Sequence, residues 1–224
     1  MEGPMQQNTW KVVCLVVLLL FTAHPFFGVI AGPDSHLSIP QCRGPGCEIV
    51  AVERPWPEAL QSGMPFRLGA YRMSIPSDPL EVQFQPALDL AVIRYKEGTL
   101  AIALRRIDEI VATVSTKGAE PQSLTGADFP RLVFTITPND PEPSTLVDKV
   151  IWRFAMDSKG AYFKYTEEAY AFVHGQVKAY AAPVKWGRFD HLIFVAMEGR
   201  EDFLEISTNG ITWPVLQSII GSTK

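Results

Sequence analysis

The sequence predicts an α+β protein with a mostly antiparallel sheet and two or three helices, preceded by an N-terminal membrane-spanning or signal helix. Three observations support this predicted fold class. A long apolar run lies near the start of the chain, strand-like segments follow at hairpin-length separations, and two helical segments interrupt and end that series. A parallel doubly wound sheet would require regular alternation of strands and helices, which this chain lacks.

The apolar run, Val12–Ala31, contains no Asp, Glu, Lys or Arg. As a helix rising ~1.5 Å per residue, it would cover the ~30 Å hydrocarbon core of a bilayer. Its first half, Val12–Thr22, also has the size of a signal-peptide core, and short residues before Gly32 permit cleavage there. The bulky Phe26 and Phe27 favour an uncleaved anchor over a signal peptide. We therefore expect residues 1–31 to be a signal-anchor or signal peptide and residues 12–31 to contact the membrane.

Both interpretations give the same orientation. Lys11 precedes the run, whereas Gly32, Pro33 and Asp34 follow it, so the N-terminus stays in the cytoplasm. The domain is then outside the cytoplasm, either membrane-anchored or exported to the periplasm of a bacterial-type cell envelope. Residues 32–47, rich in Pro, Gly and Ser, are expected to form a tether, and residues 48–224 a single extracytoplasmic α+β domain.

Cysteine spacing agrees with an oxidising compartment. Cys42 and Cys47 enclose two glycines and a proline, which can turn sharply enough for a local disulfide. Half a zinc site is the alternative, but no second Cys/His pair completes it and the histidines are scattered at positions 24, 36, 174 and 191. We expect a disulfide that shapes a turn in the tether, outside the core, and no metal.

In the first half of the domain, alternating apolar residues and proline or glycine breaks define the strands. Leu80, Val82 and Phe84 alternate strictly until Pro86 ends the segment, and residues 96–98 resemble a hairpin turn. The expected strands are Glu48–Val52, Phe66–Ile75, Leu80–Phe84, Leu88–Tyr95 and Thr99–Leu104.

The segment 99–114 carries two patterns at once. Leu100, Ile102 and Leu104 alternate as in a strand, yet a helical stripe also fits Leu100, Leu104, Ile107, Val111 and Val114. We expect a strand through Leu104 and a short helix from Ile107, and the choice between strand, helix or both stays open.

The second half begins with a predicted strand, Arg131–Thr137. A helix follows, capped by Ser144 or Thr145 with Asp148 as a capping-box acid, and Gly160 ends it. Further elements are three strands and a terminal helix: Gln176–Ala182, Phe189–Met197, Phe203–Ser207 and Trp213–Ile220.

Composition and motifs exclude several classes of function. The net charge is -4 and no basic cluster exceeds Arg105-Arg106, which argues against a nucleic-acid partner. No phosphate loop, nucleophile elbow or zinc-protease helix is present, so no cofactor and no catalytic residue is predicted. His174, His191 and Asp190 are the first residues to inspect for an enzyme, but neighbours on a strand point to opposite faces, so Asp190 should not orient His191. A non-catalytic protein is favoured over an enzyme.

Aromatic residues interleaved with lysines between positions 159 and 180 suggest a contact surface. We select four tyrosines as binding residues: Tyr162, Tyr165, Tyr170 and Tyr180. The alternative is that half of these aromatics belong to the core. The sequence thus favours a non-catalytic binding or inhibitory module, of the immunity type, with a protein partner in the envelope. An envelope enzyme whose residues converge only in the fold, and an accessory subunit of a membrane assembly, are the alternatives.

Overall fold

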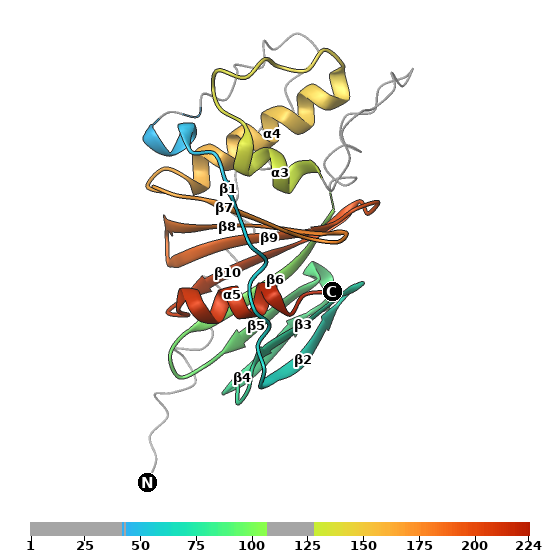
Figure 1. The fold of residues 1–224 in the computed structure, drawn as a ribbon, viewed down its shortest axis with the longest axis vertical. Coiled ribbons are helices and arrows are strands. Elements are labelled where there is room, and N and C mark those ends of the chain that lie inside the picture. The colour runs from blue at the N-terminus through green and yellow to red at the C-terminus, as the bar shows by residue number, and fades with distance from the viewer. Residues whose placement is uncertain (1–41, 43, 107–127) are drawn as a thin grey trace. The chain divides into compact units, whose positions relative to one another are not determined.

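An eight-stranded sheet organises the computed structural model, which describes residues 42, 44–106 and 128–224 (Figure 1). All neighbouring strands are antiparallel except the first pair, which is parallel. In spatial order the strands are β1 (Val52–Arg54), β7 (Tyr170–His174), β8 (Val177–Trp186), β9 (Phe189–Met197), β10 (Asp202–Asn209), β6 (Thr99–Arg106), β5 (Leu90–Arg94) and β4 (Glu81–Gln85).

The remaining elements cover the two faces of this sheet (Figure 1). Helices α3 (Asp128–Thr135) and α4 (Leu146–Tyr162) lie on one face. The other face carries the hairpin β2 (Gly63–Leu68) and β3 (Tyr71–Pro76), together with helix α5 (Trp213–Gly221). Two short 3-10 turns, η2 (Pro45–Glu48) and η3 (Pro86–Leu88), complete the described chain. The predicted α+β class and antiparallel-rich sheet are confirmed, whereas the predicted leading helix lies outside the described residues.

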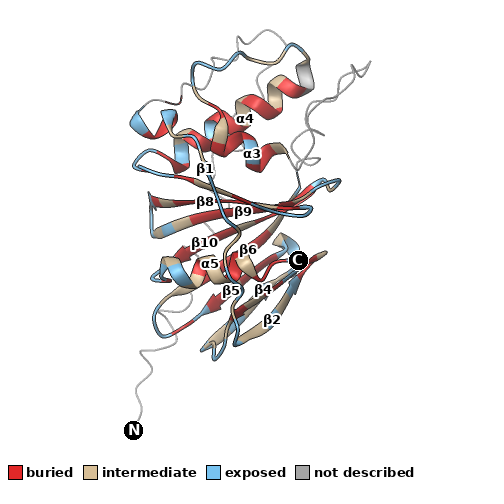
Figure 2. Ribbon diagram, in the orientation of Figure 1, coloured by how far each residue is buried: buried red, intermediate tan, exposed pale blue. Residues whose placement is uncertain are grey.

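Each face of the sheet forms its own hydrophobic core, which we call the first core and the second core. On β9, Phe194 packs in the first core under α3 and α4, while its neighbour Ile193 packs in the second core under α5 and the hairpin. Because successive side chains of a strand point to opposite faces, a strand buried on both sides reads as a continuous apolar run. This explains the sequence from Leu192 to Met197, which Figure 2 shows as mostly buried.

Several predicted elements are confirmed. Strands β4, β5 and β6 follow one another as expected, and the Tyr95 amide donates to the Gly98 carbonyl at 2.7 Å in the predicted hairpin turn. Helix α4 begins at the predicted cap, where Thr145 Oγ1 accepts from the Asp148 amide at 3.3 Å. The terminal helix α5 also matches the prediction. None of the helices among the described residues is both long enough and apolar enough to cross a membrane.

The predicted strand Arg131–Thr137 is wrong, because its residues up to Thr135 belong to helix α3. Its buried side chains Phe129, Leu132, Val133 and Ile136 recur at the spacing of a helix and enter the first core. The β-branched residues of this segment favour a strand when the sequence is taken alone, so the helical spacing was not the dominant signal. Asp128 and Pro130, in the first turn, are signals of a helix start.

Two further predictions need correction, and one strand was missed. Phe66–Ile75 is not one strand but most of the β2–β3 hairpin, which turns at Gly69 with a φ of 58°. Most of the predicted strand Glu48–Val52 precedes β1, which starts only at Val52. Strand β7 was not predicted at all. The predicted helix from Ile107 lies outside the described residues.

The predicted disulfide is confirmed, with Cα atoms 5.7 Å apart. Its expected position outside the core is wrong, since Cys42 and Cys47 are both buried in the first core. Turn η2 packs closely against the end of α4. A Cβ atom added to Gly46 would lie only 1.6 Å from the Phe163 carbonyl oxygen, which is too close for any side chain. Only glycine fits this approach, so the turn that the disulfide closes packs directly against the end of α4.

A buried lysine joins the same region. The Lys159 side chain is fully buried near the end of α4, and its Nζ donates to the Ile49 carbonyl at 2.6 Å and to the Ile136 carbonyl. Burial lowers the Lys159 pKa to about 8, and the charges of Asp140 and Glu48 partly oppose this shift. One ammonium thus ties the segment after η2 and the segment after α3 to α4.

We expect Lys159→Met to lower the free energy of unfolding by about 1–3 kcal/mol at pH 7, because two buried carbonyls lose their donor. Urea denaturation measures this change. The matched control Lys164→Met alters an exposed lysine and should leave the stability nearly unchanged. Equal stabilities of wild type and Lys159→Met would contradict this role.

The same pair of proteins reports the lowered pKa. Between about pH 8 and the ordinary lysine value of 10.5, the unfolded chain holds a proton that the folded chain releases. The wild-type free energy of unfolding should therefore rise with pH over this window relative to that of Lys159→Met. A difference that stays constant or shrinks with pH would show that the Lys159 pKa is not lowered.

Candidate functional site

The structure separates the four tyrosines selected from the sequence. Tyr162 and Tyr180 are mostly buried in the first core, at 6% exposed each, although Tyr180 also lines a hollow of about 220 Å³. Tyr165 is 57% exposed, and Tyr170 is half-buried on β7. Two of the four therefore remain available as contact residues.

Tyr170 lies in a stack that we call the aromatic stripe, defined as the exposed Arg54 and the half-buried Tyr170, Trp213 and His191. The Arg54 guanidinium lies 5.4 Å from the Tyr170 ring centroid. The Tyr170 and Trp213 centroids are 5.5 Å apart, and Trp213 stacks on His191 at 5.6 Å with the planes 20° apart. These distances are typical of cation–π and offset aromatic contacts.

The sheet and α5 bring these four residues together from distant positions. The parallel β1–β7 register pairs Val52 with Tyr170, which puts Arg54 two residues further along the same edge. Trp213, the first residue of α5, packs against the second core and bridges Tyr170 on β7 to His191 on β9. Strand β8 lies between those two strands. The stripe therefore extends from β1 over β7 and β8 to β9 on the face that α5 covers.

The His191 ring also contacts a residue of the neighbouring strand β10. Its Nδ1 lies 3.3 Å from Thr208 Oγ1, and burial lowers the His191 pKa while Asp190 opposes that shift. Asp190 is engaged elsewhere, since its Oδ2 accepts from the Gly210 amide at 2.6 Å in the turn before α5. Thr208 is fully buried, so its hydroxyl cannot reach a substrate. The Thr208–His191 contact positions the ring under Trp213 and does not present a nucleophile.

The second predicted histidine lies in a different place. His174 is 5.4 Å from the Trp56 ring, and Trp56 Nε1 donates to the Gly221 carbonyl at 3.1 Å. Gly221 ends α5, whereas Trp213 begins it. His174 and His191 therefore stack near opposite ends of one helix and do not share a site.

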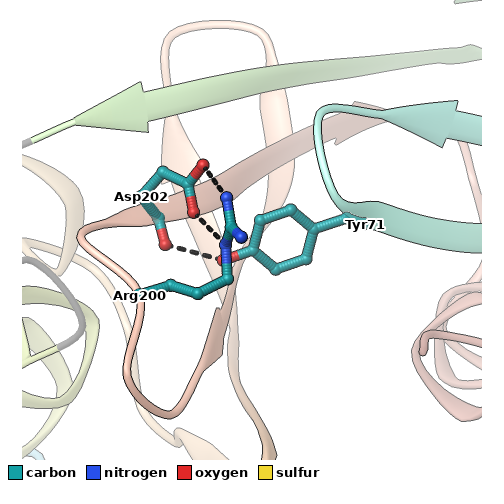
Figure 3. A network of polar contacts seen from close by, with 3 residues as sticks. All are labelled: Tyr71, Arg200 and Asp202. Carbon is teal, nitrogen blue, oxygen red and sulfur yellow. Dashed lines mark hydrogen bonds and ion pairs between the residues drawn. The ribbon is translucent and has the colours of Figure 1, made fainter.

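A buried polar network joins the hairpin to the β9–β10 turn (Figure 3). Arg200 binds the Asp202 carboxylate through Nε at 2.6 Å and Nη2 at 2.7 Å. The Tyr71 hydroxyl donates to the Asp202 carbonyl at 2.6 Å, and burial raises the Tyr71 pKa, assisted by the Asp202 charge. Tyr71 is fully buried, so its hydroxyl fastens β3 to β10, while the Arg200 side chain on the other side of Asp202 is 39% exposed.

The surface around Tyr165 differs from the stripe. A hollow of about 450 Å³ is lined there by Lys164, Glu167, Lys185 and the Tyr165 ring, over which Lys164 Nζ lies 5.2 Å from the centroid. Charges of both signs meet in it, so it selects no single ligand charge. In the described parts of the chain, no group of three or more His, Cys, Asp or Glu residues is placed to hold a metal ion.

No protein-family model, curated protein or solved structure matches this chain. Two residues of the stripe, Arg54 and Trp213, were not predicted from the sequence. Their only local signals are a Trp at a helix start, directly before Pro214, and an Arg at an edge-strand end. Neither signal indicates that the two side chains flank Tyr170.

We expect Tyr71→Phe to lower the free energy of unfolding by about 1–2 kcal/mol, because the buried Asp202 carbonyl loses its donor. Thermal or urea unfolding measures the change. Tyr165→Phe is the matched control on an exposed ring and should have almost no effect. A Tyr71→Phe protein as stable as wild type would show that this hydroxyl does not fasten the hairpin.

Proposed function

We propose that this chain is a non-catalytic binding or inhibitory module of a cell envelope, of the immunity type, that contacts a protein partner through the aromatic stripe. The single observation that carries the proposal is the half-exposed stack of Arg54, Tyr170, Trp213 and His191. Arg, Tyr and Trp are the residues that most often carry binding energy at protein interfaces.

The geometry of the stripe supports a contact role. Each ring is already held by its neighbours, so binding would freeze few additional rotamers and lose little entropy. Val52, paired with Tyr170, and nearby Val50 in the chain are both exposed and add apolar surface at the same edge. An arginine and stacked rings surrounded by aliphatic side chains resemble the composition of an interface centre.

The location of the module is part of the proposal. The apolar run 12–31 would anchor or export the chain, and the Cys42–Cys47 disulfide agrees with an oxidising compartment. Among the described residues, no observation favours the two alternatives, an envelope enzyme or an accessory subunit. The fully buried Thr208 hydroxyl beside His191 speaks against catalysis at the one histidine in the stripe.

We expect Tyr170→Ala to weaken partner binding by about fivefold or more, which corresponds to the loss of more than ~1 kcal/mol at a hot spot. The partner is first captured from solubilised envelopes with the tagged full-length protein and identified by mass spectrometry. Its affinity for each purified variant is then measured by titration.

Tyr165→Ala is the matched control, since it removes an exposed tyrosine outside the stripe and should leave the affinity unchanged. Circular dichroism confirms that both variants are folded. The proposal fails if Tyr165→Ala weakens binding and Tyr170→Ala does not. It also fails if His191→Ala abolishes a catalysed reaction while partner binding is retained.

A further inference from the structure

The chain enters the domain as a segment that we call the strap, residues 44–54. The strap begins with turn η2, which the Cys42–Cys47 disulfide closes beside α4, and it ends as strand β1 (Figure 1). Directly after it, Trp56 Nε1 donates to the Gly221 carbonyl at 3.1 Å, which ties this end of the strap to α5. The strap is therefore fastened at both of its ends, by the disulfide turn at one and by Trp56 at the other.

Backbone contacts hold the middle of the strap. The Ala51 amide donates to the Phe134 carbonyl and the Val52 amide to the Ala169 carbonyl, both at 2.9 Å. Lys159 Nζ adds its contact to the strap backbone at 2.6 Å. Water can replace each of these partners once the strap is lifted, so the contacts favour the docked position only modestly.

Apolar burial in the strap is concentrated at its first turn. Within the described part of residues 42–54, the buried residues are Cys42, Gly46 and Cys47, whereas all three residues of β1 are exposed. Ile49 and Ala51 are only partly buried against the first core. Because apolar burial is the main favourable contribution to folding, the docked position depends mainly on the disulfide turn.

We propose that the Cys42–Cys47 disulfide is a redox-sensitive clasp, which a dithiol opens to release the strap from α4 and β7. Trp56 keeps the released strap attached, so that reoxidation docks it again in the same place. Arg54 ends the strap, and its guanidinium lies 5.4 Å from the Tyr170 ring centroid while β1 is docked. For its effect on binding the clasp rests on the proposed function, because its release takes Arg54 out of the aromatic stripe.

The chemistry of opening is thiol–disulfide exchange. Cys42 is the point of attack, because it is 8% exposed and Cys47 only 2%. A thiolate of the dithiol bonds to Cys42 Sγ, and Cys47 leaves as a thiolate that takes up a proton. The second thiol of the reagent then displaces Cys42, which also takes up a proton. The chain gains two electrons and two protons, and the dithiol is oxidised to its own disulfide.

Separating the two sulfurs disturbs the turn. Two unbonded thiols need more room between their sulfur atoms than a disulfide does. The turn has no room to widen towards α4, since Gly46 already lies against the Phe163 carbonyl. It therefore widens away from α4, and the contacts of Cys42 and Cys47 with the first core are lost.

Hydrogen–deuterium exchange of the full chain in detergent, before and after treatment with dithiothreitol, tests the clasp. The Ala51 and Val52 amides should exchange at least about tenfold faster in the reduced protein, while the amides of β9 and β10 keep their protection. Reoxidation with oxidised glutathione should restore the slow exchange. Unchanged exchange of Ala51 and Val52 would overturn the proposal. A loss of protection in β9 and β10 as well would also overturn it, because the disulfide would then stabilise the whole domain.

Two further measurements do not depend on the exchange of the reduced wild type. Treatment with dithiothreitol in the absence of denaturant should let iodoacetamide label both Cys42 and Cys47, and labelling that requires urea would overturn the proposal. The double variant Cys42→Ser/Cys47→Ser should show the fast exchange without dithiothreitol. The matched control Cys14→Ser, which leaves both cysteines of the disulfide in place, should exchange like wild type. A double variant that exchanges like wild type contradicts the clasp.

Partner binding separates the clasp from the proposed function. Reduction should weaken the affinity for the captured partner about fivefold or more, as Arg54→Ala should in the oxidised protein. If Tyr170→Ala weakens binding and reduction does not, the role of the clasp in binding is overturned and the proposed function stands. If neither change weakens binding, the proposed function fails, and the exchange of Ala51 and Val52 still decides whether the strap is released.

Discussion

The structure depends on one constraint, which is that the central strands are buried on both faces and must be covered from both sides. Strand β9 illustrates it, with Ile193 in the second core and Phe194 in the first. The covers come from distant parts of the chain, and each is fastened by a buried polar contact. Lys159 holds the α3–α4 side through two carbonyls, and Tyr71 holds the hairpin side through the Asp202 carbonyl. These contacts leave the buried donors and acceptors paired, which apolar packing alone would not achieve.

Two-sided cover leaves the two ends of the sheet as the parts of it that the described elements cover least. At one end, α5 stops short of enclosing the β1–β7 edge, so Tyr170 and Trp213 remain half-buried and stacked. At the other end, the second core reaches the surface at Val82 and Phe84. The two exposed surfaces thus arise from the same feature of the architecture.

Local signals predicted the parts of the fold that local forces determine. The Thr145 cap with Asp148, the alternation of Leu80, Val82 and Phe84, and the Cys42–Cys47 spacing all led to correct elements. The prediction of a strand at 131–137 was wrong because the β-branched residues there favour a strand in isolation, while packing against the first core favours a helix. Strand β7 was missed because its five residues show no regular alternation of buried and exposed positions, although it forms a local hairpin with β8 as well as pairing with the distant β1.

The candidate surface was predictable only in part. Tyr170 could be selected from the sequence, but whether each tyrosine is buried or exposed is decided by strand register and helix packing, which removed Tyr162 and Tyr180. The central claim, that the chain acts by contact through the aromatic stripe, is tested most directly by a photo-reactive amino acid introduced in living cells. Placed at Val52, beside Tyr170, this amino acid should cross-link the chain to one other protein, which appears as a single product of higher mass. The same amino acid at the exposed Lys185 should give no such product. A partner adduct from Lys185 with none from Val52 would contradict the claim.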